Sequence, residues 1–126
     1  GCQAEIGSAS AMAAGGVAYL MGGDAVQISH AAALALKNLL GLACDPVAGL
    51  VEVPCVKRNV MGAVNAMTSS DMVMAGITSK IPPDEVIDAM RAIGRSMSED
   101  IRETGKGGLA GTPTGVAIRE RMAGTL

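Results

Sequence analysis

The spacing of apolar and polar residues predicts helices along most of the chain. A first helix is expected over residues 6–21, where small and larger apolar residues are mixed, and it should end at Gly22-Gly23. A second helix should begin after Asp24, a residue type that caps helix N-termini, and continue to about residue 40. Residues 31–36 in its middle are apolar on all sides, so we expect them to form the buried centre of the fold.

Three more helices are expected in the second half of the chain. Apolar residues recur at helical spacing over 56–74, and this helix should end near Gly76. Prolines and acids at 82–85 open the next helix, whose apolar face continues to Ile101. A glycine-rich loop follows, and a last short helix is expected over 112–122. Because the pattern contains no strand of normal length, it predicts an all-α fold, a compact helical domain of about five helices.

The segment between the second and third predicted helices carries two cysteines. It reads Cys44-Asp45-Pro46-Val47-Ala48-Gly49-Leu50-Val51-Glu52-Val53-Pro54-Cys55, and it cannot be helical through its middle. Its two prolines lack a backbone donor, and Gly49 can take a positive φ. The alternation at 51–53 predicts a brief extended run. We therefore expect a rigid Pro/Gly loop that presents Cys44 and Cys55 from its two ends.

The composition supports one hydrophobic core and argues against two classes of partner. Residues 1–126 are 49% hydrophobic, but Tyr19 is the only aromatic, so aliphatic residues and nine methionines must fill a single domain. The net charge of −2 comes from mixed acids and bases, with no basic stripe or aromatic platform for nucleic acid. The apolar stretch 31–44 is broken by Lys37 and Asn38, and it is shorter than the roughly 20 residues of a membrane span.

The three cysteines, Cys2, Cys44 and Cys55, are the residues most able to carry chemistry. Their odd number does not suit the disulfide framework of a secreted protein, and the sequence shows no basic-then-apolar signal-peptide pattern. Their positions also match no zinc finger or ribbon built on C-x-x-C knuckles. We therefore expect reduced thiols in the cytoplasm. Because a candidate ligand follows Gly1 directly, we also expect an upstream part of the protein to be missing from this sequence.

The sequence spacing of the three cysteines supports two interpretations equally well. In the first, three thiolates from different elements converge on an iron–sulfur cluster and leave one of four irons open as a Lewis acid. In the second, the cysteines are buried packing residues or hold a structural zinc in a non-catalytic helical interaction module. The first interpretation requires the three sulfur atoms to lie within about 7 Å of one another.

Three segments shift this balance toward the cluster. Gly1-Cys2-Gln3-Ala4-Glu5-Ile6-Gly7-Ser8-Ala9 and the run 41–55 resemble hallmark segments of the iron–sulfur-dependent L-serine dehydratases (L-serine deaminases). Arg102-Glu103-Thr104-Gly105-Lys106-Gly107-Gly108-Leu109-Ala110 resembles the glycine-rich C-terminal segment of that family. The resemblance covers nearly the whole chain and is closest to the C-terminal part of the α subunit in members with separate α and β chains. Some fused members end in a cluster-binding cysteine, whereas this chain ends in Gly124-Thr125-Leu126.

The resemblance implies that Cys2, Cys44 and Cys55 hold a [4Fe-4S] cluster, and it implies no pyridoxal phosphate. The open iron would stabilise the departing hydroxide of L-serine while a base removes the α proton. The resulting aminoacrylate would hydrolyse to pyruvate and ammonia, a lyase reaction of amino-acid degradation that supplies gluconeogenesis. The implied partners are the β subunit or domain and the N-terminal part of the α chain, in an oligomer. Without that N-terminal part, we expect the chain alone to be inactive.

The sequence does not identify the catalytic base. His30 is a candidate, although a lone histidine in a helix is more often structural. Gly107, Gly108 and Thr112 are candidates for binding the substrate carboxylate through backbone donors at a helix start. A plain flexible loop over 105–111 is equally consistent with this pattern.

Three further polar positions have open interpretations. Asp45 and Glu5 stand near cysteines in the sequence, where a carboxylate can orient a ligand residue. They are equally well explained as helix-cap or loop acids. Ser69-Ser70-Asp71 interrupts an apolar helix and faces either the site or, as the default expectation, solvent.

Overall fold

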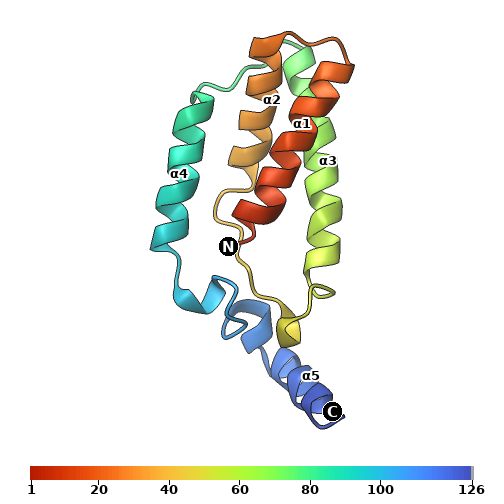
Figure 1. The fold of residues 1–126 in the computed structure, drawn as a ribbon, viewed down its shortest axis with the longest axis vertical. Coiled ribbons are helices and arrows are strands. Elements are labelled where there is room, and N and C mark those ends of the chain that lie inside the picture. Colours follow the sequence, from red (N-terminus) through yellow and green to blue (C-terminus); the bar gives the residue numbers. More distant parts are fainter. Residues whose placement is uncertain (126) are drawn as a thin grey trace.

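Helix α2 (Ala25–Asn38) lies at the centre of a helical bundle. In the computed structural model, which describes residues 1–125, α2 packs against α1 (Ser8–Leu20), α3 (Cys55–Met74) and α4 (Pro83–Ser96). Figure 1 shows these four helices running roughly side by side, with α4 at one edge of the bundle. The four helices therefore form a scaffold in which α2 is the common neighbour.

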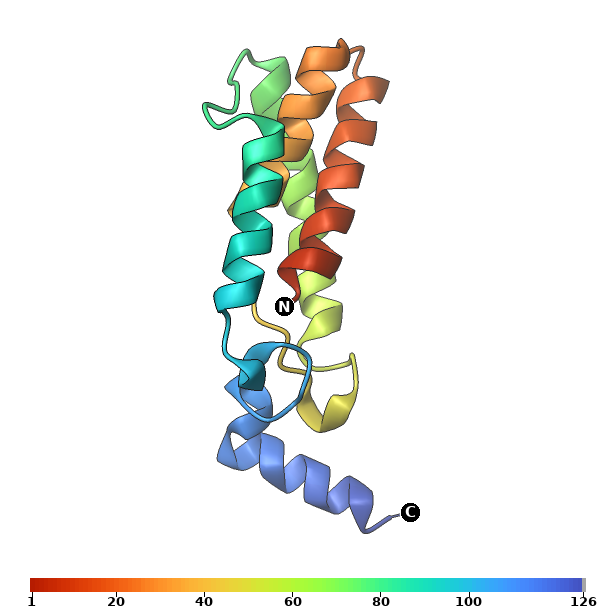
Figure 2. The same cartoon turned by 60° about the vertical axis from the view of Figure 1, so that its left-hand side comes forward.

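The fifth helix, α5 (Pro113–Ala123), extends away from one end of the bundle, as both Figure 1 and Figure 2 show. It starts where predicted, because the Thr112 hydroxyl accepts a hydrogen bond from Gly115 N–H and Pro113 occupies the first turn. The remaining described elements are four short helical turns: η1 (Gln3–Gly7), η2 (Val47–Gly49), η3 (Glu99–Ile101) and η4 (Gly108–Gly111). Residues 1–125 thus contain five α-helices and no β-strand, which confirms the all-α prediction.

The sequence signals around α2 are confirmed. Asp24 and Gln27 form a reciprocal cap, in which Gln27 N–H donates to the Asp24 carboxylate at 2.8 Å and Asp24 N–H donates to Gln27 Oε1 at 3.0 Å. In the predicted central segment 31–36, every residue except Ala32 is buried. Because three helices pack around this segment, it is the centre of the core.

Small side chains let α1, α2 and α3 approach one another closely. The core between these helices is built around alanines that are at most 2% exposed: Ala14, Ala18, Ala31, Ala35 and Ala66. At Gly62 in α3, an added Cβ would lie 2.9 Å from Ile6 Cγ2. Since a protein interior is packed as densely as an organic crystal, a larger side chain at these positions must move a helix.

The apolar spacing in α3 predicted the helix correctly, but it marks the exposed face of that helix. Val56, Val60, Val64 and Met67 are between 52% and 62% exposed. These four residues form one line along the helix, which we call the α3 stripe, because positions three or four apart share a side. Among residues 1–125, no helix combines the length and apolar character needed to cross a membrane.

The side of α3 that packs into the bundle is made of small and polar residues. Ser69 and Ser70 are 0% exposed and Asp71 is exposed, so the expected solvent exposure is wrong for both serines. Ser70 Oγ lies 2.9 Å from Ala14 O in α1 and 2.8 Å from Ala66 O, either of which can accept its proton. Both serines are small enough for close helix packing, and a backbone carbonyl satisfies the Ser70 hydroxyl. The Ser69 hydroxyl, by contrast, has no hydrogen-bond partner within residues 1–125.

Helix α4 ends earlier than its apolar face predicts. It stops at Ser96 instead of continuing to Ile101, because Met97 and Ser98 adopt extended backbone with ψ of 141° and 142°. The Ser98 hydroxyl then accepts a hydrogen bond from Asp100 N–H and caps the separate turn η3. This interruption turns the chain toward the segment that carries Cys44, as described below.

Replacing Ala14 by leucine should destabilise the bundle, because Ala14 is 0% exposed and the added carbon atoms have no free space. We expect the free energy of unfolding to fall by about 1–3 kcal/mol, the usual effect of overpacking a core. Ala13→Leu is the matched control, since Ala13 is the exposed neighbour on the same helix. Chemical denaturation measures both variants, and equal stabilities would contradict the close packing of α1.

Candidate functional site

The three cysteines come from three separate elements. Cys2 directly precedes η1, Cys44 follows α2, and Cys55 is the first residue of α3. All three are buried, with exposures of 1%, 7% and 6% respectively, and all three are free thiols. Cys2 and Cys44 also belong to one hydrophobic cluster, which includes Ile6 and Leu39. Residues that are far apart in the sequence are thus brought to a common buried region.

The three thiols are close enough to influence one another. Cys2 hydrogen-bonds to Cys44, and charge interactions connect Cys55 with both other cysteines. Burial, followed by the hydrogen bond to Cys44, raises the pKa of the Cys2 thiol to about 11. Burial also raises the pKa of Cys44 and of Cys55. The free thiols are therefore protonated at neutral pH and are poor nucleophiles.

The three cysteine side chains are not arranged as the ligands of a single metal ion. Within residues 1–125, no group of three or more His, Cys, Asp or Glu side chains is placed to hold a single ion. Thiolates around one tetrahedral zinc would have to lie about 3.8 Å apart. Thiolates around a four-iron cluster are more widely spaced, at up to about 7 Å.

Cys44 is held by backbone hydrogen bonds to the segment that follows α4. Its N–H donates to Ile101 O at 2.9 Å, and Glu103 N–H donates to Cys44 O at 3.0 Å. These bonds make an isolated parallel bridge between Cys44 and Arg102. Figures 1 and 2 both show the cysteine loop beside the segment 97–111, at the end of the bundle where α5 begins. The glycine-rich segment therefore packs against the cysteine loop.

The cysteine loop folds back on itself and does not form an extended run. Val47 N–H donates to Val53 O at 2.9 Å, which closes the loop, and η2 lies inside it. The expected positive φ of Gly49 is confirmed at 73°, and Ala48 also has a positive φ, of 54°. The extended run predicted at 51–53 is wrong, because these residues form a turn. Alternation could not show this, since the hydrogen bond between Val47 and Val53 determines the local shape.

Gln3 fixes the position of Cys2, although the sequence analysis did not single it out. Gln3 begins the π-helical turn η1, so helical structure starts three residues before the predicted position. Its side chain is buried, its Nε2 donates to Met90 O at 2.9 Å, and its Oε1 accepts from Gly41 N–H at 2.9 Å. One amide therefore ties the start of the chain to α4 and to the end of α2. The only sequence signal was an amide next to a candidate ligand.

Asp45 is a buried carboxylate with two strong partners. It is 4% exposed, Arg58 Nη1 donates to its Oδ1 at 2.6 Å, and Leu109 N–H donates to its Oδ2 at 2.7 Å. Burial acts to raise the pKa of Asp45, but these hydrogen bonds and the charge of Arg58 outweigh burial and hold it below its usual value. These contacts favour the interpretation that Asp45 orients the loop around Cys44. Glu5, by contrast, is exposed.

The residues predicted to bind a substrate carboxylate have structural partners. The Thr112 hydroxyl caps α5 and donates to Leu109 O at 2.8 Å, and the Thr112 N–H donates to the same carbonyl. Gly107 N–H donates to the backbone of η3 at 2.9 Å. Gly108 has a φ of 59°, and a Cβ at this residue would lie 2.6 Å from Asp45 Cβ. A substrate role for Gly107, Gly108 and Thr112 remains a prediction.

His30 lies away from the cysteines. Its Nδ1 accepts a hydrogen bond from Ser79 N–H at 3.0 Å, so it anchors the connection between α3 and α4. Along α2, His30 is about 12 Å from Asn38 at the C-terminal end, after which the chain continues to Cys44. The structure thus assigns His30 a structural contact, and a role as catalytic base remains a prediction.

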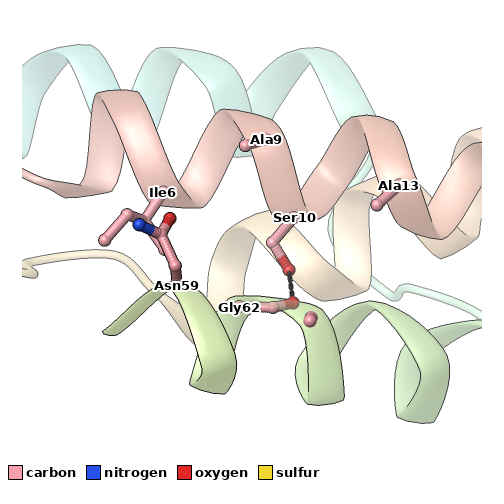
Figure 3. A pocket seen from close by; sticks show the side chains of 7 residues that line it. Ile6, Ala9, Ser10, Ala13, Asn59 and Gly62 are labelled. Atoms are coloured by element: carbon pink, nitrogen blue, oxygen red, sulfur yellow. Dashed lines mark hydrogen bonds between the residues drawn. The ribbon is translucent and has the colours of Figure 1, made fainter. Parts of the chain in front are cut away.

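A small groove opens between α1 and α3 next to the cluster that contains Cys2. Figure 3 shows Ile6 of η1 and Ser10 of α1 facing α3, with Ser10 Oγ donating to Gly62 O at 2.7 Å. The groove has a volume of about 190 Å³, and its other lining residues are Ala9, Ala13, Asn59 and Ala63. Because this lining is almost entirely apolar, the groove suits the packing of aliphatic groups and not the recognition of a charged ligand.

Comparison with known proteins assigns a family to this helical domain with three converging cysteines. The family model described as serine dehydratase alpha chain matches residues 1–110, a range that includes all three cysteines. The chain belongs to the serine dehydratase alpha chain family. This match confirms the resemblance that the hallmark segments indicated.

Individual relatives agree with this assignment. The chain is 62% identical over 124 residues to proteins of Latilactobacillus sakei and of Bacillus subtilis, each named "Probable L-serine dehydratase, alpha chain". It is 55% identical over 119 residues to the "L-serine dehydratase, alpha chain" of Peptoniphilus asaccharolyticus. These alignments cover 98%, 98% and 94% of this chain, but 59%, 41% and 41% of the respective relatives. The chain therefore spans about half, or somewhat less, of the length of the relatives it matches.

Replacing Gly108 by alanine should displace Asp45 from its hydrogen bond with Leu109 N–H, because the new Cβ would collide with the Asp45 side chain. We expect the free energy of unfolding to fall by about 2–4 kcal/mol, of which roughly 1–2 kcal/mol reflects the positive φ. Gly105→Ala is the control, since Gly105 has a similar φ of 64° but its Cβ would lie 3.5 Å from the nearest atom, Pro46 O. Thermal and chemical denaturation measure the difference, and equal losses in the two variants would contradict the contact with Asp45.

Proposed function

We propose that this chain is part of an iron–sulfur-dependent L-serine dehydratase that converts L-serine to pyruvate and ammonia. The observation that carries the proposal is that three buried cysteines come together in a member of the serine dehydratase alpha chain family. The names of the relatives support L-serine as the substrate. The proposed reaction requires no pyridoxal phosphate.

The donor set fits a [4Fe-4S] cluster held by Cys2, Cys44 and Cys55. Iron–sulfur clusters are bound by cysteine thiolates that converge from different elements, and these three thiols are buried, free and mutually interacting. Three protein ligands leave one of four irons without a thiolate. When bound, such a cluster supplies a Lewis acid that polarises the hydroxyl of the substrate.

The residues of this chain hold and shield the group in the proposed site. Cys44 and Cys55 approach from the two ends of the cysteine loop, and Cys2 approaches from η1, where Gln3 anchors the backbone. Burial excludes water from the three sulfur atoms. Burial also raises the pKa of all three thiols, so without a bound metal they are protonated at neutral pH, and they would release protons on binding the cluster.

The proposal extends to the complete protein. We propose that residues 1–126 form one helical domain, the C-terminal part of a longer α chain that works in the cytoplasm with a β subunit or domain, as an oligomer. The lengths of the relatives support a longer chain, and their names specify an alpha chain.

The α3 stripe supports a covering partner, because a row of exposed apolar residues on a helix marks an interaction surface. We propose that the rest of the α chain covers this stripe and that residues 1–126 alone are inactive.

The competing interpretation is a non-catalytic helical module in which the cysteines pack or bind zinc. Anaerobic purification of the complete α chain separates the two, since a cluster gives a brown protein with visible absorption and zinc or free thiols give a colourless one. A brown protein containing iron and sulfide would support the dehydratase. A colourless protein that contains stoichiometric zinc would support the module.

Substituting Cys44→Ser or Cys55→Ser in the complete enzyme should remove visible absorption and activity together, because each thiolate is needed to hold the cluster. The measurement is pyruvate formation from L-serine by the α chain and its β partner, reconstituted anaerobically with iron and sulfide. Exposure of the wild type to oxygen should have the same effect, since an iron without a protein thiolate is the most easily lost.

A cysteine nucleophile would behave differently in this experiment. Its substitution would leave the visible absorption intact, and the activity of the wild type would not depend on iron. Full turnover by a colourless, iron-free preparation would refute the proposed function.

A further inference from the structure

We propose that Arg58 is a positioning residue for the three cysteines, which holds both chain neighbours of Cys44 from α3 and stands beside Cys2. The proposal depends on the proposed function only for the identity of the group that the thiols bind. The contacts themselves belong to the chain without any bound metal, so they can be tested separately.

Arg58 connects the helix that starts with Cys55 to the residues around Cys44. Arg58 lies three residues after Cys55, so both side chains project from the same side of the first turns of α3. Its Nη1 donates to Ala43 O at 2.9 Å and to Asp45 Oδ1 at 2.6 Å. These acceptors belong to the residues directly before and after Cys44, so one nitrogen atom restrains Cys44 from both sides.

Arg58 also faces the other two cysteines. Burial dominates the pKa of Cys2 and of Cys55 and raises both, whereas the charge of Arg58 acts on each thiol in the opposite direction. After the larger effects of burial and of Asp45, the Cys2 thiol in turn acts to raise the pKa of Arg58, so the two side chains are neighbours. The Arg58 side chain is 18% exposed, and a planar guanidinium offers five donors at fixed angles. It therefore binds the loop carbonyl and the carboxylate together and has further donors on the side chain that neighbours Cys2.

Arg58 acts on the thiol site mainly by restraining the cysteine loop through hydrogen bonds, and less through its positive charge. The 2.6 Å separation between Arg58 Nη1 and Asp45 Oδ1 is that of a hydrogen-bonded ion pair, which acts at longer range as a dipole. The second Asp45 oxygen accepts from Leu109 N–H and extends the restraint to the glycine-rich segment. Arg58, Asp45 and Leu109 thus fix the cysteine loop against two other parts of the chain.

The test compares Arg58→Met with Lys57→Met in the complete α chain. Both substitutions remove one positive charge from the same turn of α3, but Lys57 is exposed and serves as the matched control. Arg58→Lys is the conservative variant, since it keeps the charge on a shorter side chain that lacks the planar fork. Circular dichroism first establishes that each variant is folded.

Amide hydrogen exchange in the metal-free chain measures the positioning directly. We expect Leu109 N–H and Glu103 N–H, which bond to Asp45 and Cys44, to exchange at least roughly tenfold faster in Arg58→Met than in Lys57→Met. Arg58→Lys should fall between the two, because lysine can restore one contact with Asp45 but not the full set.

Iron release measures the consequence for the bound group. After anaerobic reconstitution with iron and sulfide, we expect a chelator to remove iron roughly 10–100-fold faster from Arg58→Met than from Lys57→Met, the usual effect of losing a residue that orients metal ligands. Visible absorption follows the same loss. Lys57→Met should match the wild type in both measurements.

Each other outcome is decisive. Equal exchange in Arg58→Met and Lys57→Met would overturn the positioning role, and so would faster exchange with unchanged iron release, because Arg58 would then stabilise the loop only. If the wild type takes up no iron, the proposed cluster fails, and the exchange result alone decides whether Arg58 positions the cysteines. If Arg58→Met does not fold, Arg58→Lys decides by the same comparisons.

Discussion

The buried carboxylate of Asp45 is the interaction on which the geometry of the thiol site depends. A carboxylate that is 4% exposed is tolerated only if its charge and lone pairs are matched, and Arg58 and Leu109 N–H supply these partners. The partners come from α3 and from η4, so satisfying one charge joins three parts of the chain. Removing one member of a buried ion pair lowers the free energy of unfolding by about 3–5 kcal/mol, much more than the loss of a surface ion pair does. The cysteine loop therefore adopts the conformation that keeps the pair between Asp45 and Arg58 intact.

The bundle determines where the cysteines can lie. Cys2 precedes the turn that leads into α1, Cys44 follows α2, and Cys55 opens α3, so each thiol is attached to the end of a different bundle helix. Alanine and glycine contacts between these helices fix how closely their ends approach. Close packing in the middle of the bundle therefore sets the separation of the thiols at its end.

Local signals explain what the sequence could predict, and distant contacts explain what it could not. The helices and the cap at Asp24 follow from local spacing and short-range hydrogen bonds, and the cysteine set came from the family resemblance. The buried side of α3 was not predictable, because the residues of the α3 stripe are as apolar as a core. Gln3 and Arg58 were missed because one amide and one guanidinium form no pattern, and their partners Met90 and Asp45 lie 87 and 13 residues away.

The long-range hydrogen bonds of the site also determine when it can form during folding. Helices and their caps need only neighbouring residues, whereas Gln3 bonds to a residue 87 positions later and Asp45 to one 64 positions later. Bringing residues so far apart in the sequence together lowers the entropy of the chain, and this cost comes before their hydrogen bonds can stabilise the folded site. We therefore expect the bundle to assemble first, and the thiol site to be completed only after the chain as far as Leu109 has left the ribosome and packed back onto the cysteine loop.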